Sequence, residues 1–265
     1  MSLQAFVQGI GFLGPGLANW PDAARVLAGG REYAPAPTVL PAPSLLPPTE
    51  RRRTGRVVKL ALAIASEAVT HAGAPAGQLR SVFSSSGGDG HNCHEICRTL
   101  AATPPEISPT RFSNSVHNAS AGYWSIATGA TAASTVLCAF DGSFCAGLLE
   151  ALTQVSVDRE PVLLVAYDTE YPDPLHAKRP VPDAFGIALV LARNCDARSV
   201  ARIEAALGGE PADILEDPRL EALRRTIPAA RALPLLRQVA LQTQRRVVLE
   251  YLDVCNVAVE VAPCR

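Results

Sequence analysis

The sequence predicts an α/β protein, because buried strands alternate with helices along most of the chain. Three strongly apolar stretches are typical of buried strands: STVLCAF, EPVLLVAYDTE and FGIALVLAR. Segments with apolar residues at helical spacing separate these stretches, and glycine-containing turns join strands to helices. Repeated strand–turn–helix units indicate a sheet covered by helices.

The first hundred residues hold two predicted strands and two predicted helices. Residues 5–12, AFVQGIGF, predict a short strand, and the proline-dense stretch after it excludes helix interior and central strand. The run VVKLALAIASEAVTHAG has apolar residues on most faces at helical period and predicts a largely buried helix that ends at Gly73. LRSVFS, residues 79–84, predicts a strand entering the turn SSSGGDG, and HNCHEICRTLA predicts the helix that leaves it.

The next segment repeats this unit. SVHNASAGYWSIATG predicts a tightly packed helix, with Gly122 permitting close backbone approach and Gly129 as its C-cap. STVLCAF then predicts a fully apolar strand, and Asp141-Gly142-Ser143 the turn into the helix FCAGLLEALTQV. Asp141 is a common type of helix N-cap residue, so holding the helix start is one interpretation of it.

Beyond Asn194 the pattern weakens. SVARIEAALGG predicts a strand, residues 218–243 predict helices broken at Pro228 and Pro234, and RRVVLEYL and VAVEVAP predict terminal strands. Because no sharp linker separates this part, we expect residues 1–265 to form one domain. Residues 195–265 are then expected to pack on the sheet formed by residues 1–194.

Composition excludes several classes of protein. The 265 residues are 48% hydrophobic and 18% charged, which is too apolar for intrinsic disorder. A net charge of −1 provides no global positive field for nucleic acid. The seven cysteines are odd in number and dispersed, which favours a reducing cytoplasm. The first residues lack a basic n-region, and the uncharged residues 112–140 are too rich in small polar groups for a membrane span, so we expect neither export nor a span.

Several residues offer other chemistry. Residues 91–97, HNCHEIC, contain metal-ligand types but no second pair of ligands elsewhere, so we expect no metal and no cofactor. Cys138 or Cys145 could pair with His117 as the nucleophile of an acyltransferase or hydrolase. We expect both cysteines to lie in buried elements as inert core residues, and His117 to be a hydrogen-bonded core histidine.

From about residue 50 to residue 194, the order of motifs resembles the N-terminal half of a β-ketoacyl synthase, a member of the thiolase fold. The turn SSSGGDG, the segment EISPTRFSNSVHNASAGYWSIATG with Asn118 and Ala121-Gly122, and STVLCAFDGSFCAGLLEAL carry the resemblance, together with the strands REPVLLVAYDT and DAFGIALVLAR. It implies an α/β, thiolase-like fold with a complete first half, residues 1–194, and a shortened second half, residues 195–265.

The resemblance also implies a function. It aligns Asp141 with the nucleophilic cysteine of active ketosynthases, and no histidine follows His176, although the family uses two in its second half. The chain therefore resembles subunits with no catalytic residue of their own, namely chain-length factors and the truncated ketosynthase-like proteins of aryl polyene synthesis. Such a subunit forms a heterodimer with an active β-ketoacyl-acyl-carrier-protein synthase and shapes its acyl tunnel in polyene, polyketide or fatty-acid-type synthesis.

Interface and docking residues follow from the same resemblance. In the family the strand within residues 112–140 pairs across the dimer, which favours an interface over a plain core. The tunnel or interface residues would be Thr110, Arg111, Phe112, His117, Asn118 and Cys138. Acyl carrier proteins are acidic and would dock on basic surface, at Arg51, Arg52, Arg53 and Arg56 or at the cluster Arg219, Arg224, Arg225, Arg231, Arg237, Arg245 and Arg246. A solvated helix face is the alternative for either cluster.

Two other functions remain open at this stage. The first is a stand-alone cysteine-dependent acyltransferase or thioesterase that uses Cys138 or Cys145. The second is a homodimeric acyl-binding protein, since a homodimer is possible when no partner is present.

Overall fold

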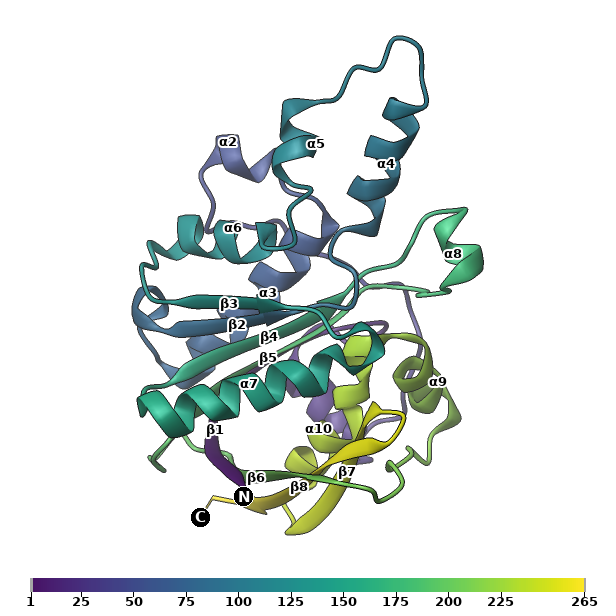
Figure 1. The fold of residues 1–265 in the computed structure, drawn as a ribbon. Helices are drawn as coiled ribbons and strands as arrows, with labels where there is room; N and C mark the ends of the chain where they lie inside the picture. Colours follow the sequence, from purple (N-terminus) through teal and green to yellow (C-terminus); the bar gives the residue numbers. More distant parts are fainter. Residues whose placement is uncertain (1, 265) are drawn as a thin grey trace.

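The computed structural model describes residues 2–264, and one eight-stranded sheet runs through them (Figure 1). The strand order is β3-β2-β4-β5-β1-β6-β8-β7. β2 pairs in parallel with β3 and β4, and the other neighbours pair antiparallel. The strands are β1 (Leu3–Leu13), β2 (Arg80–Ser84), β3 (Ser134–Leu137), β4 (Val162–Asp168), β5 (Phe185–Ala192), β6 (Ala201–Gly208), β7 (Arg245–Leu252) and β8 (Cys255–Pro263).

Helices cover both faces of this sheet. The α-helices are α1 (Trp20–Leu27), α2 (Pro48–Arg51), α3 (Arg56–Ala72), α4 (Gly90–Leu100), α5 (Pro109–Ser113), α6 (Ala119–Thr128), α7 (Ser143–Asp158), α8 (Leu175–Lys178), α9 (Pro218–Thr226) and α10 (Leu233–Leu241). Three short 3₁₀ turns are η1 (Ala76–Gln78), η2 (Phe140–Gly142) and η3 (Pro228–Ala232). α3 and α6 pack on one face, whereas α7 and α10 lie between the first strands and the β6–β8–β7 part (Figure 1).

Two of the three predicted buried strands of the first half, and the buried helix ending at Gly73, are confirmed. Every residue of β4 and of β5 is buried, as their continuous apolar sequence predicts. α3 ends where Gly73 takes the left-handed conformation that glycine tolerates best. Gly9 and Gly11 let β1 approach α3 closely, since a Cβ at either position would overlap a carbonyl oxygen of that helix.

The strand predicted from STVLCAF differs from expectation. β3 spans only four residues and is partly exposed, because it is an edge strand that pairs with β2 alone. Cys138 follows its last residue and is exposed, so the prediction that this cysteine lies inside a buried strand is wrong. The apolar sequence correctly predicts a strand. Within residues 2–264, however, no second strand pairs with its outer edge, and its residues stay partly exposed.

α6 also lacks a covering surface on one side. Gly129 ends the helix in a left-handed conformation, as predicted. A Cβ at Gly122, however, would meet no heavy atom of the described chain within 4 Å. The predicted close backbone approach at Gly122 is therefore not made within residues 2–264.

A buried carboxylate joins the first half of the chain to the tail. Asp168, at the end of β4, is 4% exposed. Its Oδ1 accepts hydrogen bonds from the backbone N–H of Ser86 (2.8 Å) and from the Ser86 hydroxyl (2.6 Å). Its Oδ2 accepts the N–H of Ala229 in η3 at 2.9 Å. One side chain therefore connects the turn after β2, the end of β4 and a segment of the tail.

The Asp168 carboxyl makes stability depend on pH. Burial raises its pKa from 3.8 to about 6, against the smaller opposing effect of the Ser86 and Ala229 hydrogen bonds. The folded state therefore holds this proton more tightly than the unfolded chain. The contribution of Asp168 to the free energy of unfolding should be greatest below about pH 4, fall by about 3 kcal/mol as the pH rises to about 6, and stay constant above it.

Urea unfolding of the wild type and of Asp168→Asn between pH 4 and pH 8 measures this contribution. The difference in unfolding free energy, wild type minus variant, should decrease up to about pH 6 and then level off. The other titrating groups are common to both proteins, so their contributions cancel in this difference. The carboxyl carbon shift of Asp168 in the wild type reads the same titration directly if the variant does not fold. A difference that is flat with pH, with Asp168 titrating near 4, would contradict the assignment.

Candidate functional site

The turn between β3 and α7 holds the position aligned with a nucleophile. Phe140 adopts φ +51°, a left-handed conformation that costs energy for an aromatic residue and that marks strained strand-to-helix turns. The prediction that Asp141 caps α7 is wrong, because the N-cap is Gly142 and no side chain bonds the free N–H groups there. The strained residue of this turn is therefore Phe140, and Asp141 follows it.

Asp141 instead binds arginines from later segments. Its Oδ1 accepts a hydrogen bond from Nη2 of Arg179 at 2.6 Å, and its Oδ2 lies 3.6 Å from Nη2 of Arg231. The Arg179 guanidinium also covers the Phe140 ring, 3.7 Å from the ring centroid. Ser143 is buried, and its hydroxyl donates to the Phe140 carbonyl and accepts from the Ala139 N–H. This turn therefore presents an aromatic ring and an ion-paired carboxylate, which are poor acyl acceptors.

The two cysteines near the turn differ in environment. Cys145 is buried in α7 as predicted, and burial raises the pKa of its thiol to about 12. Cys138 is exposed, and its Sγ lies 3.1 Å from the Ser86 carbonyl oxygen. His117 is exposed as well, so the prediction of a core histidine is wrong. No hydrogen bond joins His117 to either thiol within residues 2–264.

The uncharged residues 112–140 form a largely exposed face, called here the uncharged face. Four of its large apolar side chains are exposed, Phe112 67%, Val116 53%, Ile126 54% and Phe140 64%, whereas Tyr123 and Trp124 are buried. A groove of about 400 Å³ runs over it, between α5 and the Gly122 side of α6. Asn118 is exposed at the start of α6. The alternative that residues 112–140 are plain intramolecular core is therefore wrong for this side of the segment.

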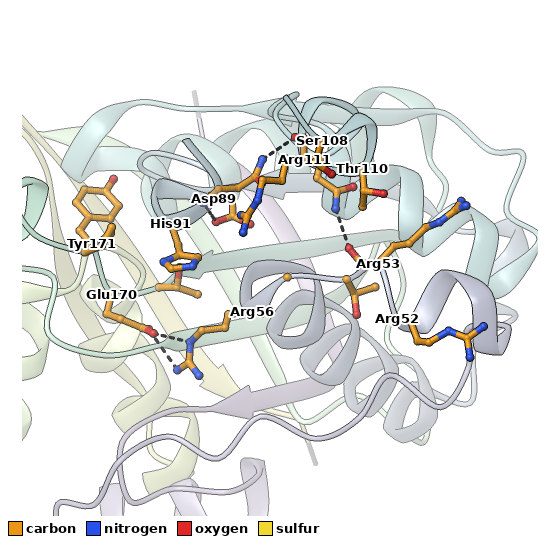
Figure 2. Close-up of a pocket in the computed structure, with 16 residues that line it drawn as sticks. Arg52, Arg53, Arg56, Asp89, His91, Ser108, Thr110, Arg111, Glu170 and Tyr171 are labelled. Atoms are coloured by element: carbon orange, nitrogen blue, oxygen red, sulfur yellow. Dashed lines mark hydrogen bonds and ion pairs between the residues drawn. The ribbon is translucent and has the colours of Figure 1, made fainter. Parts of the chain in front are cut away.

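A second cavity, called here the basic pocket, has a volume of about 390 Å³ (Figure 2). It brings together Arg52, Arg53 and Arg56 from the α2–α3 segment with Thr110 and Arg111 of α5. Sequence reasoning assigned these two groups to different roles and did not predict that they meet. His91 and residues 169–172 also line the pocket, and no local sequence signal marks them.

Hydrogen bonds and ion pairs fix the pocket walls. Asn92 Nδ2 donates to the Arg111 carbonyl at 2.9 Å, and Asn114 Nδ2 donates to the Arg53 carbonyl at 2.8 Å. Arg56 pairs with Glu170 at 2.5 Å (Figure 2). Arg53 pairs with Glu50 at 3.1 Å, and Arg111 with Glu95 at 3.5 Å. Arg52 lies outside these pairs.

Arg51 and the tail arginines are arranged differently. Arg51 donates to the Ser44 and Leu46 carbonyls and does not line the basic pocket. Most arginines of the tail cluster pair with carboxylates: Arg219 with Asp217, Arg224 with Glu221 and Glu250, Arg231 with Glu250, Arg237 with Glu216, Arg245 with Asp213, and Arg246 with Glu210. The tail cluster therefore presents less free positive charge than its sequence suggests.

Among residues 2–264, no three His, Cys, Asp or Glu side chains gather closely enough to hold a metal ion, and this includes residues 91–97. In the same range every helix is too short or too polar to cross a bilayer.

Solved structures share this fold. A chain from a ketosynthase in complex with its chain length factor from Xenorhabdus doucetiae is 22% identical, with a TM-score of 0.74 over 97% of this chain and 99% of that one. A chain of the ishigamide ketosynthase/chain length factor is 13% identical, with a TM-score of 0.72 over 99% and 100%. A type II polyketide synthase acyl-carrier protein in complex with its ketosynthase gives 9% identity and a TM-score of 0.75 over 100% of both chains. These likenesses confirm the predicted thiolase-like ketosynthase fold.

Sequence comparison supplies the family. No curated protein matches the sequence significantly. The profile of the beta-ketoacyl synthase N-terminal domain, however, matches residues 20–247, which is most of the chain. The match includes the glycine turn, the uncharged face and the turn between β3 and α7. The chain therefore belongs to the β-ketoacyl synthase family.

Proposed function

We propose that the chain is a ketosynthase-like subunit of the chain-length-factor type, which has no catalytic residue of its own. It pairs with an active β-ketoacyl-acyl-carrier-protein synthase and shapes the acyl tunnel of that partner. The observation that carries this proposal is the uncharged face, because residues 112–140 contain no Asp, Glu, Lys or Arg and yet expose four large apolar side chains. An exposed apolar surface without charge is typical of a protein interface.

The edge of the sheet supports pairing at this face. β3 has a hydrogen-bonded neighbour on one side only, so its other backbone edge is free to pair with a strand of a partner. The groove beside Gly122 leaves room for close approach of a second backbone. In such a pair Thr110, Arg111, Phe112, His117, Asn118 and Cys138 are proposed to lie at the interface or along the tunnel wall.

The turn at Phe140 supports the lack of catalysis. An acyl-transfer enzyme needs a nucleophile that an adjacent base or a positive field activates. Here the strained position holds a phenyl ring under Arg179, and the carboxylate at the aligned position is held by Arg179 and Arg231. The partner is proposed to supply the cysteine and the histidines, in a cytoplasmic complex for polyene, polyketide or fatty-acid-type synthesis, with the aryl polyene pathway as the specific context.

The relatives of known structure support the same assembly. Two of the matched chains come from structures that pair a ketosynthase with a chain length factor, and a third comes from a ketosynthase with its acyl-carrier protein. We propose that the basic pocket receives the carrier protein, since Arg52 has no carboxylate partner there and arginines recognise acidic surfaces well.

A binding experiment tests the heterodimer. The chain, mixed with an active ketosynthase from the same organism that retains its cysteine and histidines, should form a 1:1 complex by size-exclusion chromatography with light scattering. Ile126→Glu should weaken this complex at least about thirtyfold, because it buries a charge in the apolar interface. Val254→Glu is the matched control, since Val254 is 89% exposed at the β7–β8 turn, and it should have no effect.

Two outcomes would contradict the heterodimer or its proposed interface. One is a chain that stays a homodimer or a monomer in the presence of the ketosynthase. The other is a complex that Ile126→Glu and Val254→Glu weaken equally, which would place the interface elsewhere.

Charge reversal tests the docking of the carrier protein. Arg52→Glu should lower the affinity of the assembled pair for acyl carrier protein about three- to tenfold at low salt and reduce its salt dependence, because it removes a free cation. Arg245→Glu makes the matched change in the tail cluster and should leave the affinity unchanged. Isothermal titration at two salt concentrations measures the affinity of both variants. A loss of affinity in Arg245→Glu but not in Arg52→Glu would place the docking site in the tail cluster.

Thiol labelling tests the alternative of a cysteine enzyme. At pH 8, iodoacetamide should modify exposed Cys138 in the folded chain and leave Cys145 unmodified, since burial keeps that thiol protonated. Peptide mass spectrometry with and without guanidinium provides the comparison, because both cysteines should react once the chain unfolds. A stable acyl adduct on either cysteine, formed from an acyl thioester at a catalytic rate, would favour the acyltransferase or thioesterase.

A further inference from the structure

A third cavity, with a volume of about 270 Å³, opens beside η2 and is lined by four cations. Lys178 ends α8, and Arg179 follows it. Arg225 comes from the end of α9 and Arg231 from η3. Phe140 and Asp141 also line it. Neither the proposed interface nor the proposed carrier-docking pocket uses these four cations.

The positive charge of this cavity is only partly balanced. Asp141 pairs with Arg179 at 2.6 Å and lies 3.6 Å from Arg231, which also pairs with Glu250 at 3.1 Å. Within residues 2–264, no carboxylate lies at ion-pair distance from Lys178 or Arg225. Four cations thus face two carboxylates, which leaves a site that attracts an anion with two negative charges.

Two of these cations are held in place before any ligand arrives. The side chains of Arg179 and Arg231 are only 19% and 13% exposed. Stacking on Phe140 fixes the guanidinium of Arg179, and its buried Nε finds no acceptor in the described part of the chain. Fixed guanidinium groups lose little side-chain entropy when they bind an oxyanion. Lys178 and Arg225 are exposed and can reach the ligand from the solvent side.

We propose that this cavity binds a phosphate group, either as inorganic phosphate or at the end of a small phosphate monoester. Arginine forks match the oxygens of phosphate, and a phosphate monoester carries about two negative charges at neutral pH. The volume suits a phosphate with a short ester group and is smaller than most sites for drug-sized ligands. This site goes beyond the proposed subunit function, because it requires neither the ketosynthase partner nor the basic pocket.

Isothermal titration of the full chain with inorganic phosphate, ethyl phosphate and acetate at low ionic strength tests the site. Phosphate should bind 1:1 with a dissociation constant at or below about 1 mM, and acetate should bind at least about tenfold more weakly because it carries one charge. Binding of ethyl phosphate as tightly as inorganic phosphate would show that the site accepts a phosphate monoester, whereas binding of inorganic phosphate alone would assign it to the free ion.

Matched variants locate the binding. The double variant Lys178→Gln, Arg225→Gln should weaken phosphate binding at least about tenfold and leave the thermal midpoint unchanged, since both side chains are exposed and unpaired. Arg52→Gln removes an unpaired cation from the basic pocket and should leave phosphate affinity unchanged. No saturable binding by about 20 mM phosphate, equal binding of acetate, or an equal loss in Arg52→Gln would overturn the proposal. None of these results depends on whether a ketosynthase binds.

Discussion

The buried carboxylate of Asp168 is the contact on which the arrangement of the site depends. Three donors from two distant segments converge on it: the N–H and hydroxyl of Ser86 and the N–H of Ala229. Burying this charge is costly, which is why its pKa is raised, and only several good hydrogen bonds offset the cost. Because Ala229 and Arg231 both belong to η3, this bond also sets where the tail meets the turn at Phe140. A substitution at Asp168 would therefore disturb the turn at Phe140 and the cavity beside η2, although Asp168 belongs to neither.

Apolar and positively charged surfaces lie next to each other on this chain. On one side the uncharged face exposes Phe112, Val116 and Ile126 around a groove, with the free edge of β3 following α6 in the chain. Cations gather at two other places, the basic pocket and the cavity beside η2. An apolar contact between proteins needs a face without charge, whereas acidic ligands need concentrated positive charge. The groove and the basic pocket are neighbours, because Arg53, Thr110 and Asn114 line both of them. Phe140 likewise belongs to the uncharged residues and lines the cavity beside η2. The proposed partner would therefore lie directly beside the proposed anion sites.

Sequence patterns predicted the elements far better than they predicted the surroundings of the site. Continuous apolar runs located β4 and β5, and helical spacing with a terminal glycine located α3, because each pattern records which side chains avoid water. The same reasoning placed Cys138 in a core, because an apolar strand looks alike whether its own chain or a partner covers it. The pairing of Asp141 with Arg179 and Arg231 was invisible in the sequence, since tertiary contacts between distant segments leave no local period.

The turn at Phe140 combines a strained backbone with two contacts of Arg179. A left-handed residue at the end of a strand costs energy, and enzymes accept that cost where it aims a nucleophile at the substrate. Here the same backbone strain aims a phenyl ring at Arg179, which lies 3.7 Å from the ring centroid and also binds Asp141. The strain is therefore compensated by a cation–π contact and an ion pair. These contacts occupy the strained position and the carboxylate beside it, and they are the physical basis of the proposal that a partner supplies the chemistry.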